Sequence, residues 1–393
     1  MFKRNVLAVS MTLAALCSAQ AAMADINGGG ATLPQPLYQT SGVLTTGFAA
    51  YIGVGSGNGK SAFLNNDYTK FVAGVTNKNV HWAGSDSKLT AAELLAYKTN
   101  KQPTWGKLIQ APSVATSVAI PFNKAGANAV DLSVNQLCGV FSGRLTDWSQ
   151  ITGAGRTGAI KVIYRSESSG TTELFTRFLN AKCAETQPFA VTTTFSSSYG
   201  AGLPAGAVAA TGSQGVMTAL NAQDGAITYM SPDYAATTLA GLDDATKVAK
   251  VGGVSPAPAN VSTAIGQIPA PTEARADGSF IDATNQDNWV PVFAATASGP
   301  ATFAYPSSGY PILGFTNVIF SQCYADATQT TQVRAFFNRH YGNLINNDTA
   351  INNNRFVPLP ANWKKAVRDT FATASSAQGI GNTSVCNAIG RPL

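Results

Sequence analysis

Charged residues and histidines are scarce in this chain, which excludes several functions at once. Only 12% of the 393 residues are charged, and the two histidines are His81 and His340. Two separate histidines do not make the ligand cluster of a zinc hydrolase, and no C-x-x-C pair is present to hold zinc. No run of basic residues marks a nucleic-acid surface. We therefore expect no metal, no cofactor and no nucleic-acid partner.

Long apolar stretches are also missing after the first two dozen residues, which have the pattern of an export signal. Lys3-Arg4 precedes the apolar stretch Val6–Leu16, which is too short to span a bilayer comfortably. Ala22-Met23-Ala24 matches the A-x-A cleavage pattern, so we expect a signal peptide over residues 1–24 and a mature chain from Asp25. Cys17 lacks the small preceding residue of a lipid-attachment site. We expect a periplasmic or secreted protein.

The mature chain would have 369 residues, enough for two packed lobes, and a net charge of +4 from 24 basic and 20 acidic residues. An even number of cysteines in an oxidising compartment favours disulfides, and four cysteines allow three pairings. Their spacing suggests two local disulfides, Cys138–Cys183 and Cys323–Cys386.

Short apolar runs alternate with helix signals, which predicts an α/β fold. Capping boxes at Thr90–Glu93 and Ser133–Gln136 begin two helices. The region Val254–Asp287 is rich in Pro, Ala, Asn and Asp and is predicted to be loop. The strand candidates are Val114–Phe122, Lys161–Tyr164, Ala226–Met230 and Ile312–Phe320.

The segment Arg165–Thr171 predicts an oxyanion-binding turn. It follows a strand and opens a helix, whose first N–H groups are unpaired and attract anions. Ser169 and Thr171 add hydroxyl donors, Gly170 lets the backbone approach closely, and Arg165 can give two parallel hydrogen bonds. The alternative is an ordinary helix start with Arg165 paired to Glu167 on the surface.

Three more segments combine glycine with small polar residues: Gly28–Pro34, Gly53–Lys60 and Gly84–Ser87. The second ends like a nucleotide-binding P-loop, but Val54 stands where that motif needs glycine. Nucleotide binding is therefore not predicted. A turn that presents Ser56 to a small anion and a plain turn both remain open.

Asp86, in the third of these segments, bears on which anion could bind. Phosphate near neutral pH carries a proton, so an ionised carboxylate can accept a hydrogen bond from it. Sulfate has no proton to donate, so the same carboxylate would repel it. The alternative role for Asp86 is that of a turn or capping residue.

Motifs of nucleophilic catalysis are incomplete. Ser85–Lys88 matches S-x-x-K without its companion motifs, and no G-x-S-x-G elbow occurs. His340 falls on an apolar helical face with Val333, Phe336 and Phe337, so it is expected to be packed there. The role of His81 stays open.

Five motifs in order give the chain a specific resemblance. Directly after the predicted cleavage site stands Asp25-Ile26-Asn27-Gly28. The motifs that follow are Gly30–Pro34, Gly55-Ser56-Gly57, Arg165–Thr171 and Phe356–Pro360. The chain resembles the phosphate-binding proteins of bacterial ABC transporters (the PstS family), and most closely their DING branch. Framework segments Leu108–Phe122, Gly225–Tyr229 and Tyr310–Ile312 extend the resemblance over essentially the whole mature chain.

The resemblance implies a two-lobed periplasmic-binding-protein fold (type II, Venus-flytrap) that closes on inorganic phosphate. The first lobe would combine residues 25–119 and 311–393, and the second would be residues 120–310. The residues that would bind phosphate by position are Thr32, Leu33 (through its N–H), Ser56, Asp86, Arg165, Ser169, Gly170 and Thr171.

Two residues depart from the family pattern: Glu167 stands where Asp is usual, and Ser168 where Gly is usual. Glu167 could still support Arg165 by pairing with it. The implied function is high-affinity phosphate binding by a monomer that delivers phosphate to an ABC permease. Two alternatives stay open, a secreted alkaline phosphatase of the DING type and an extracellular adhesion protein.

Overall fold

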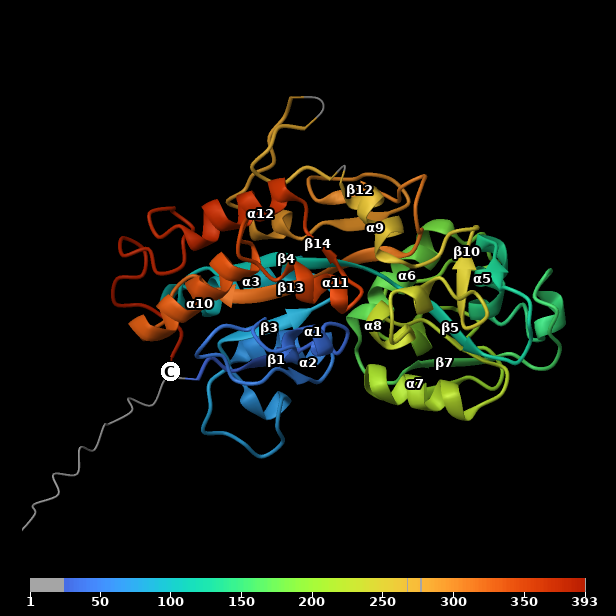
Figure 1. Ribbon diagram of the computed structural model, residues 1–393. Helices are drawn as coiled ribbons and strands as arrows, with labels where there is room; N and C mark the ends of the chain where they lie inside the picture. The colour runs from blue at the N-terminus through green and yellow to red at the C-terminus, as the bar shows by residue number, and fades with distance from the viewer. Residues whose placement is uncertain (1–24, 267, 276–277, 393) are drawn as a thin grey trace, which may run out of the picture.

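The computed structural model describes residues 25–266, 268–275 and 278–392 and has two six-stranded sheets side by side (Figure 1). The predicted signal peptide lies outside the described residues. Within the described part of the chain, no helix has the length and apolar character needed to cross a membrane.

The first sheet combines the two ends of the described chain. Its strands, in spatial order, are β14 (Val357–Pro358), β4 (Leu108–Ser117), β13 (Leu313–Ser321), β3 (Trp82–Ser85), β1 (Gly28–Gly30) and β2 (Ile52–Gly53). β1 runs parallel to both β2 and β3, whereas β13 is antiparallel to β3 and β4. Every residue of β4 and β13 is buried, and this includes polar residues such as Gln110, Thr116 and Asn317.

The second sheet is formed by the middle of the chain. Its strands, in spatial order, are β6 (Asp131–Leu132), β10 (Val248–Val251), β5 (Ile120–Asn123), β9 (Ala226–Thr228), β7 (Lys161–Arg165) and β8 (Val208–Ala210). β7 is parallel to both of its neighbours. A separate parallel pair, β11 (Val292–Ala294) and β12 (Thr302–Ala304), completes the strands of the described residues.

The chain passes from the first sheet to the second between β4 and β5. The prediction of one strand over Val114–Phe122 is therefore wrong, because the apolar run is split between two sheets. At the break, Ala119 pairs with Met230 in an isolated bridge. The pattern of hydrophobic residues did not reveal the break, since the residues on both sides of it are buried, including the polar Thr116 and Ser117 before it.

Helices cover the first sheet at α1 (Gln35–Gln39), α2 (Ser56–Asn65), α3 (Ala91–Asn100), α4 (Gln102–Trp105), α10 (Ala327–His340), α11 (Asp348–Asn353) and α12 (Ala361–Val367). The second sheet is accompanied by α5 (Val134–Ser142), α6 (Gly170–Lys182), α7 (Gly212–Ala222) and α8 (Pro232–Ala235). Short 3-10 turns are η1 (Tyr68–Lys70), η2 (Trp148–Gln150), η3 (Phe195–Ser197), η4 (Ala240–Leu242) and η5 (Gln286–Trp289), and η6 (Arg368–Ala372) is a π turn. Both predicted capping boxes form, at the starts of α3 and α5.

One helix was missed within the predicted loop. α9 (Pro258–Ile265) begins with proline in its first turn and buries Val261, Ala264 and Ile265, three residues on one helical face. α9 and η5 contact β4 of the first sheet, while β11 contacts α6. The lobe boundaries at residues 119 and 311 stay a prediction, because this segment touches elements of both sheets.

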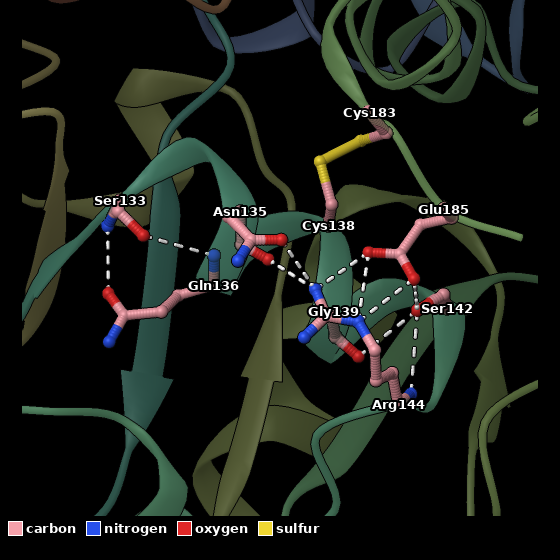
Figure 2. The surroundings of a disulfide bond; sticks show 9 residues. All are labelled: Ser133, Asn135, Gln136, Cys138, Gly139, Ser142, Arg144, Cys183 and Glu185. Carbon is pink, nitrogen blue, oxygen red and sulfur yellow. Dashed lines mark hydrogen bonds and ion pairs between the residues drawn. A yellow bond between two sulfur atoms is a disulfide. The ribbon is translucent and has the colours of Figure 1, made fainter.

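Two disulfides link the same pairs that the spacing suggested. Cys138–Cys183 joins α5 to the end of α6, with a Cα–Cα distance of 5.6 Å. Cys323–Cys386 joins the C-terminal segment to the chain just after β13, with a Cα–Cα distance of 5.3 Å. Beside the first disulfide, Arg144 donates to Glu185 and to the Asn135 carbonyl (Figure 2). The disulfide and these hydrogen bonds together hold α5 against the segment that follows α6.

Candidate functional site

The turn from β7 into α6 presents unpaired backbone donors. β7 ends at Arg165, and Ser169 is the N-cap of α6, where its Oγ accepts the Thr172 N–H at 3.2 Å. The N–H groups of Gly170 and Thr171, at the first two helical positions, have no partner within the helix. The Ser169 hydroxyl oxygen accepts the capping hydrogen bond, so its proton can still be donated to another acceptor.

Arg165 is held from two directions. It is 2% exposed, and its Nε donates to Glu167 Oε1 at 2.7 Å, with a second contact from Nη2 to the same oxygen. Glu167 Oε1 also accepts the Gly212 N–H at 3.1 Å. The longer side chain of Glu167 thus still pairs with Arg165 and connects it to the start of α7.

Four other predicted residues follow the parallel strands of the first sheet. Gly30 of β1 pairs with Gly53 of β2 and with Gly84 of β3. Loops that leave these strands therefore meet at one edge of the sheet, as in other parallel sheets. The loops carry Thr32 and Leu33 after β1, Ser56 after β2 and Asp86 after β3.

Hydrogen bonds join these loops to each other and to α6. The Asp86 N–H donates to Ser56 Oγ at 3.1 Å, and Thr171 Oγ1 donates to Asp86 Oδ2 at 3.2 Å. Gly170 lies so close to the first sheet's loops that a Cβ there would be 2.4 Å from Ser56 Oγ and 2.6 Å from Asp86 Cβ. The structure thus brings four of the predicted residues together across the sheets, Ser56, Asp86, Gly170 and Thr171, and Gly170 permits their approach. Hydrogen bonds that would join Leu33, Arg165 or Ser169 to the other sheet are not among these contacts.

Asp86 has an unusual environment for a carboxylate. Burial raises its pKa to about 6, against the opposing influences of Thr316, Arg165 and Thr171. Its Oδ1 is buried and forms no hydrogen bond of normal geometry within the described residues, although the Thr316 hydroxyl, also without a partner of its own, lies close enough to lower the Asp86 pKa. A buried carboxylate oxygen without a donor is costly, so this atom is suited to accept a proton from a ligand.

Charged side chains do not make this site electropositive. Arg165 contributes one positive charge, and Glu167 and ionised Asp86 contribute two negative charges, which gives a sum of −1. Favourable potential for an anion comes instead from the N-terminal ends of α2, α6 and α7, which begin at Ser56, Gly170 and Gly212. Fixed dipoles and hydroxyl donors therefore have to supply the attraction.

Two contributors were not found from the sequence. Ser213, at the second position of α7, shares a hydrogen bond of 2.9 Å with Thr32 Oγ1 across the two sheets. Tyr229 Oη accepts the Arg165 N–H at 3.3 Å and pairs with Thr172 Oγ1 at 2.7 Å. Thr211-Gly212 is a local signal for the start of α7, which carries Ser213. The partner of Ser213, Thr32, is 181 residues away in the sequence, so the contact itself had no local signal.

Ser168, the second atypical residue, is accommodated by a glycine of the other sheet's loops. A Cβ on Gly57 would lie 2.4 Å from Ser168 Oγ, and that hydroxyl donates to Thr193 Oγ1 at 2.9 Å. The Ser168 carbonyl faces the Gly57 N–H at 3.5 Å. The Ser168 side chain therefore fits because residue 57, in the first turn of α2, has no Cβ.

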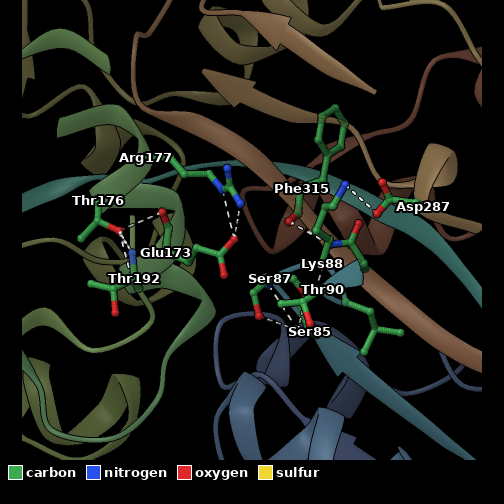
Figure 3. A network of polar contacts seen from close by, with 12 residues as sticks. Ser85, Ser87, Lys88, Thr90, Glu173, Thr176, Arg177, Thr192, Asp287 and Phe315 are labelled. Atoms are coloured by element: carbon green, nitrogen blue, oxygen red, sulfur yellow. Dashed lines mark hydrogen bonds and ion pairs between the residues drawn. The ribbon is translucent and has the colours of Figure 1, made fainter. Parts of the chain in front are cut away.

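The rim of the site is charge-balanced. Arg177 of α6 donates to Glu173 Oε1 at 2.8 Å, and Lys88 pairs with Asp287 at 2.8 Å. Figure 3 shows these two pairs on opposite sides, with Ser87 between them. Because each cation has a carboxylate partner, the rim adds little net field for an approaching anion.

Both histidines have structural surroundings. His81 accepts the Asn27 N–H at its Nδ1, and burial lowers its pKa to about 3. His340 lies against Ser113 in the core, where burial lowers its pKa to about 4, as expected for a packed residue. No group of three His, Cys, Asp or Glu suited to a metal occurs in the described ranges.

Comparison with known proteins agrees with this geometry. A family model described as a PBP superfamily domain matches residues 18–336. A structure of the high-affinity periplasmic phosphate-binding protein PfluDING, bound with phosphate, has a TM-score of 0.90 and 72% identity over 94% of this chain and all of that one. This chain is a DING-type member of the PBP superfamily. The expected two-lobed α/β binding-protein fold is thereby confirmed.

Other relatives of this DING-type chain carry two different functional names. Alkaline phosphatase L of Pseudomonas aeruginosa (strain UCBPP-PA14) is 69% identical over the full length of both chains. A phosphate-binding protein from an unknown prokaryotic organism is 68% identical over 94% of this chain and all of the relative. Membership of the family is therefore clear, while the names alone do not choose between binding and hydrolysis.

Proposed function

We propose that this chain binds one inorganic phosphate ion, as HPO4 or H2PO4, between its two lobes with high affinity and without catalysis. The ligand would contact Thr32, the Leu33 N–H, Ser56 and Asp86 from one lobe. Arg165, Ser169, Gly170 and Thr171 would reach it from the other, with Glu167 in support.

The partnerless Oδ1 of Asp86 is the observation that carries the proposal. This buried oxygen lies among hydroxyls and helix N-termini that favour an anion. Only an anion with its own proton satisfies both the donors and this acceptor. Phosphate and arsenate fulfil that condition near neutral pH, and sulfate does not.

The donor set supports tight binding. Ser56 Oγ and Ser169 Oγ each accept a backbone N–H in the structure, which leaves their protons free to point at a ligand. Arg165 is already oriented by Glu167, so little side-chain entropy is lost on binding. Preorganised donors of this kind replace the hydration shell of an anion efficiently.

The setting would be phosphate acquisition in the periplasm or the extracellular space after removal of residues 1–24. Lobes of residues 25–119 with 311–393, and of residues 120–310, would close on the ligand by bending near Ala119 and Gly309. We propose a monomer that delivers phosphate to an ABC permease of the inner membrane.

A phosphomonoesterase is the second candidate, favoured by relatives named alkaline phosphatase L. A phosphate site could serve as a product site. The described residues around Asp86 and Arg165 offer no histidine, because His81 and His340 are both packed elsewhere. Asp86, whose pKa is raised to about 6, would then be the candidate general acid for a leaving group.

One preparation separates the two functions. The mature chain is freed of phosphate and titrated with phosphate and sulfate by calorimetry, and hydrolysis of p-nitrophenyl phosphate is assayed with and without chelator. We expect binding of phosphate, no measurable binding of sulfate and no hydrolysis. Hydrolysis that persists through purification and disappears in Arg165→Ala would overturn the binding-only function.

A further inference from the structure

Arg355 makes polar contacts between the two sheets outside the predicted phosphate site. It lies two residues before β14, whose Val357 pairs with Ala115 of β4 in the first sheet. Its Nη2 donates to the Asp233 carbonyl at 2.9 Å, and its Nη1 donates to the Thr237 carbonyl at 3.1 Å. Asp233 lies in α8 and Thr237 lies two residues after it, and α8 follows β9 of the second sheet.

The backbone at Arg355 is in a conformation that favours glycine. Its φ is +65°, in the left-handed region, where a non-glycine residue is strained. The strained turn aims the guanidinium at α8, and Nη1 also donates to the Asn353 carbonyl at 3.1 Å. The preceding Asn354 ties this turn to Thr40 at the end of α1. The turn is thus anchored to the first sheet's helices.

These contacts depend on how the sheets are placed relative to each other. The connection between β4 and β5 is short, and a rotation about it would move α8 relative to β14. Hydrogen bonds near 3 Å are lost after a displacement of about 1 Å. An opening rotation that moved α8 away from β14 by this much would break the Arg355 contacts, which are formed in the arrangement that the structure shows.

We propose that Arg355 is an affinity-determining residue for the bound anion, because its bonds to the Asp233 and Thr237 carbonyls stabilise the closed form alone. This inference rests on the proposed phosphate binding. Arg355 acts on the closing equilibrium and not on the ligand, and no hydrogen bond joins it to the predicted site in the described chain. By linkage, loss of the contact lowers the closed population and speeds ligand release.

The backbone carbonyls, and not the Asp233 carboxyl, are the acceptors in this proposal. Burial raises the pKa of Asp233 to about 8, so the carboxyl is mostly neutral at pH 7. Asp233 Oδ2 and Arg355 Nε are both buried without a hydrogen-bond partner in the described residues. The hydrogen bonds that Arg355 forms therefore go to the carbonyls, while its charge still favours the ionised form of the Asp233 carboxyl.

The test uses the full mature chain, freed of phosphate, with inorganic phosphate as the probe. We compare the wild type with Arg355→Ala, Arg355→Gly, Asp233→Asn and Arg368→Ala. Arg368 is the matched control, because it donates to the Tyr341 carbonyl and to Asn343 within the C-terminal region of the first sheet. Measured are Kd by calorimetry, the release rate by ligand chase and the apo melting temperature.

We expect both Arg355 variants to raise Kd about tenfold, mainly through faster release. Arg355→Gly also relieves the backbone strain, so its apo melting temperature should equal or exceed that of the wild type while its affinity falls. A purely structural residue would lower both together. Asp233→Asn keeps the carbonyl and should bind as the wild type does, and so should Arg368→Ala.

Several results would overturn the inference. If both Arg355 variants keep the wild-type Kd and release rate, Arg355 does not determine affinity. If Asp233→Asn loses as much phosphate affinity as the Arg355 variants, the Asp233 carboxyl and not its carbonyl is the important partner. Affinity and apo stability falling together in Arg355→Gly would make the residue merely structural. If the wild type itself fails to bind phosphate, the proposed function fails first and is recognisable as such.

Discussion

At the scale of single residues, the protonation of Asp86 decides which anions fit. Burial holds its pKa near 6, so the carboxyl is ionised at pH 8 and mostly protonated at pH 5. A protonated carboxyl can donate a hydrogen bond to sulfate, whereas the ionised form repels it. We therefore predict that sulfate affinity rises as pH falls through about 6, measured by competition with labelled phosphate.

Asp86→Asn provides the control for this residue. The amide mimics the protonated carboxyl at every pH, so the variant should bind sulfate better than the wild type and without the pH dependence. Phosphate affinity should fall because one acceptor is lost. Unchanged selectivity between phosphate and sulfate in this variant would refute the role of Asp86.

At the scale of elements, Ser169 combines a structural and a binding task at the start of α6. Ser169→Ala removes the N-cap and should cost about 1 kcal/mol of stability. It also removes a donor to the anion, which should raise Kd by about 10- to 100-fold. Ser133→Ala is the matched control, since Ser133 caps α5 and does not belong to the predicted site. It should lose similar stability in urea unfolding and keep wild-type Kd; equal Kd values in both variants would exclude Ser169 from the ligand set.

Elements with local signals could be predicted from the sequence, and those set by long-range packing could not. The capping boxes of α3 and α5 and the β7–α6 turn were found because their signals lie within a few residues. The break between β4 and β5 was missed, since the residues on both sides are buried in one sheet or the other. Ser213 was missed because its partner Thr32 comes from a distant part of the chain. The ligand residues themselves came from motif resemblance, and their contact with phosphate stays a prediction.

At the scale of the whole molecule, the Cys138–Cys183 disulfide should stabilise the fold without influencing the ligand. Cys183 follows the last turn of α6, about 20 Å from the helix start at the site. Replacing both cysteines with serine should lower the free energy of unfolding by about 2–4 kcal/mol, measured in urea. Kd for phosphate should stay the same, and a large loss of affinity would show that the disulfide also positions α6.

We expect closure of the two lobes to require a glycine at position 170, where there is no room for a Cβ. In Gly170→Ala, the new Cβ would clash with Ser56 Oγ and Asp86 Cβ, which belong to the other lobe's loops. The clash exists only when the lobes are closed, so the variant should keep its apo stability, lose phosphate affinity by about 100-fold or more and stay extended in X-ray scattering with phosphate.

Gly215→Ala controls for the gain of a methyl group in a helix. A Cβ at Gly215 of α7 meets no atom within 4 Å, so this variant should gain about 0.5–1 kcal/mol of stability and bind phosphate normally. Compaction on phosphate addition should then be seen in the wild type and Gly215→Ala but not in Gly170→Ala. If Gly170→Ala compacts and binds like the wild type, the two lobes do not meet at this glycine in the bound state.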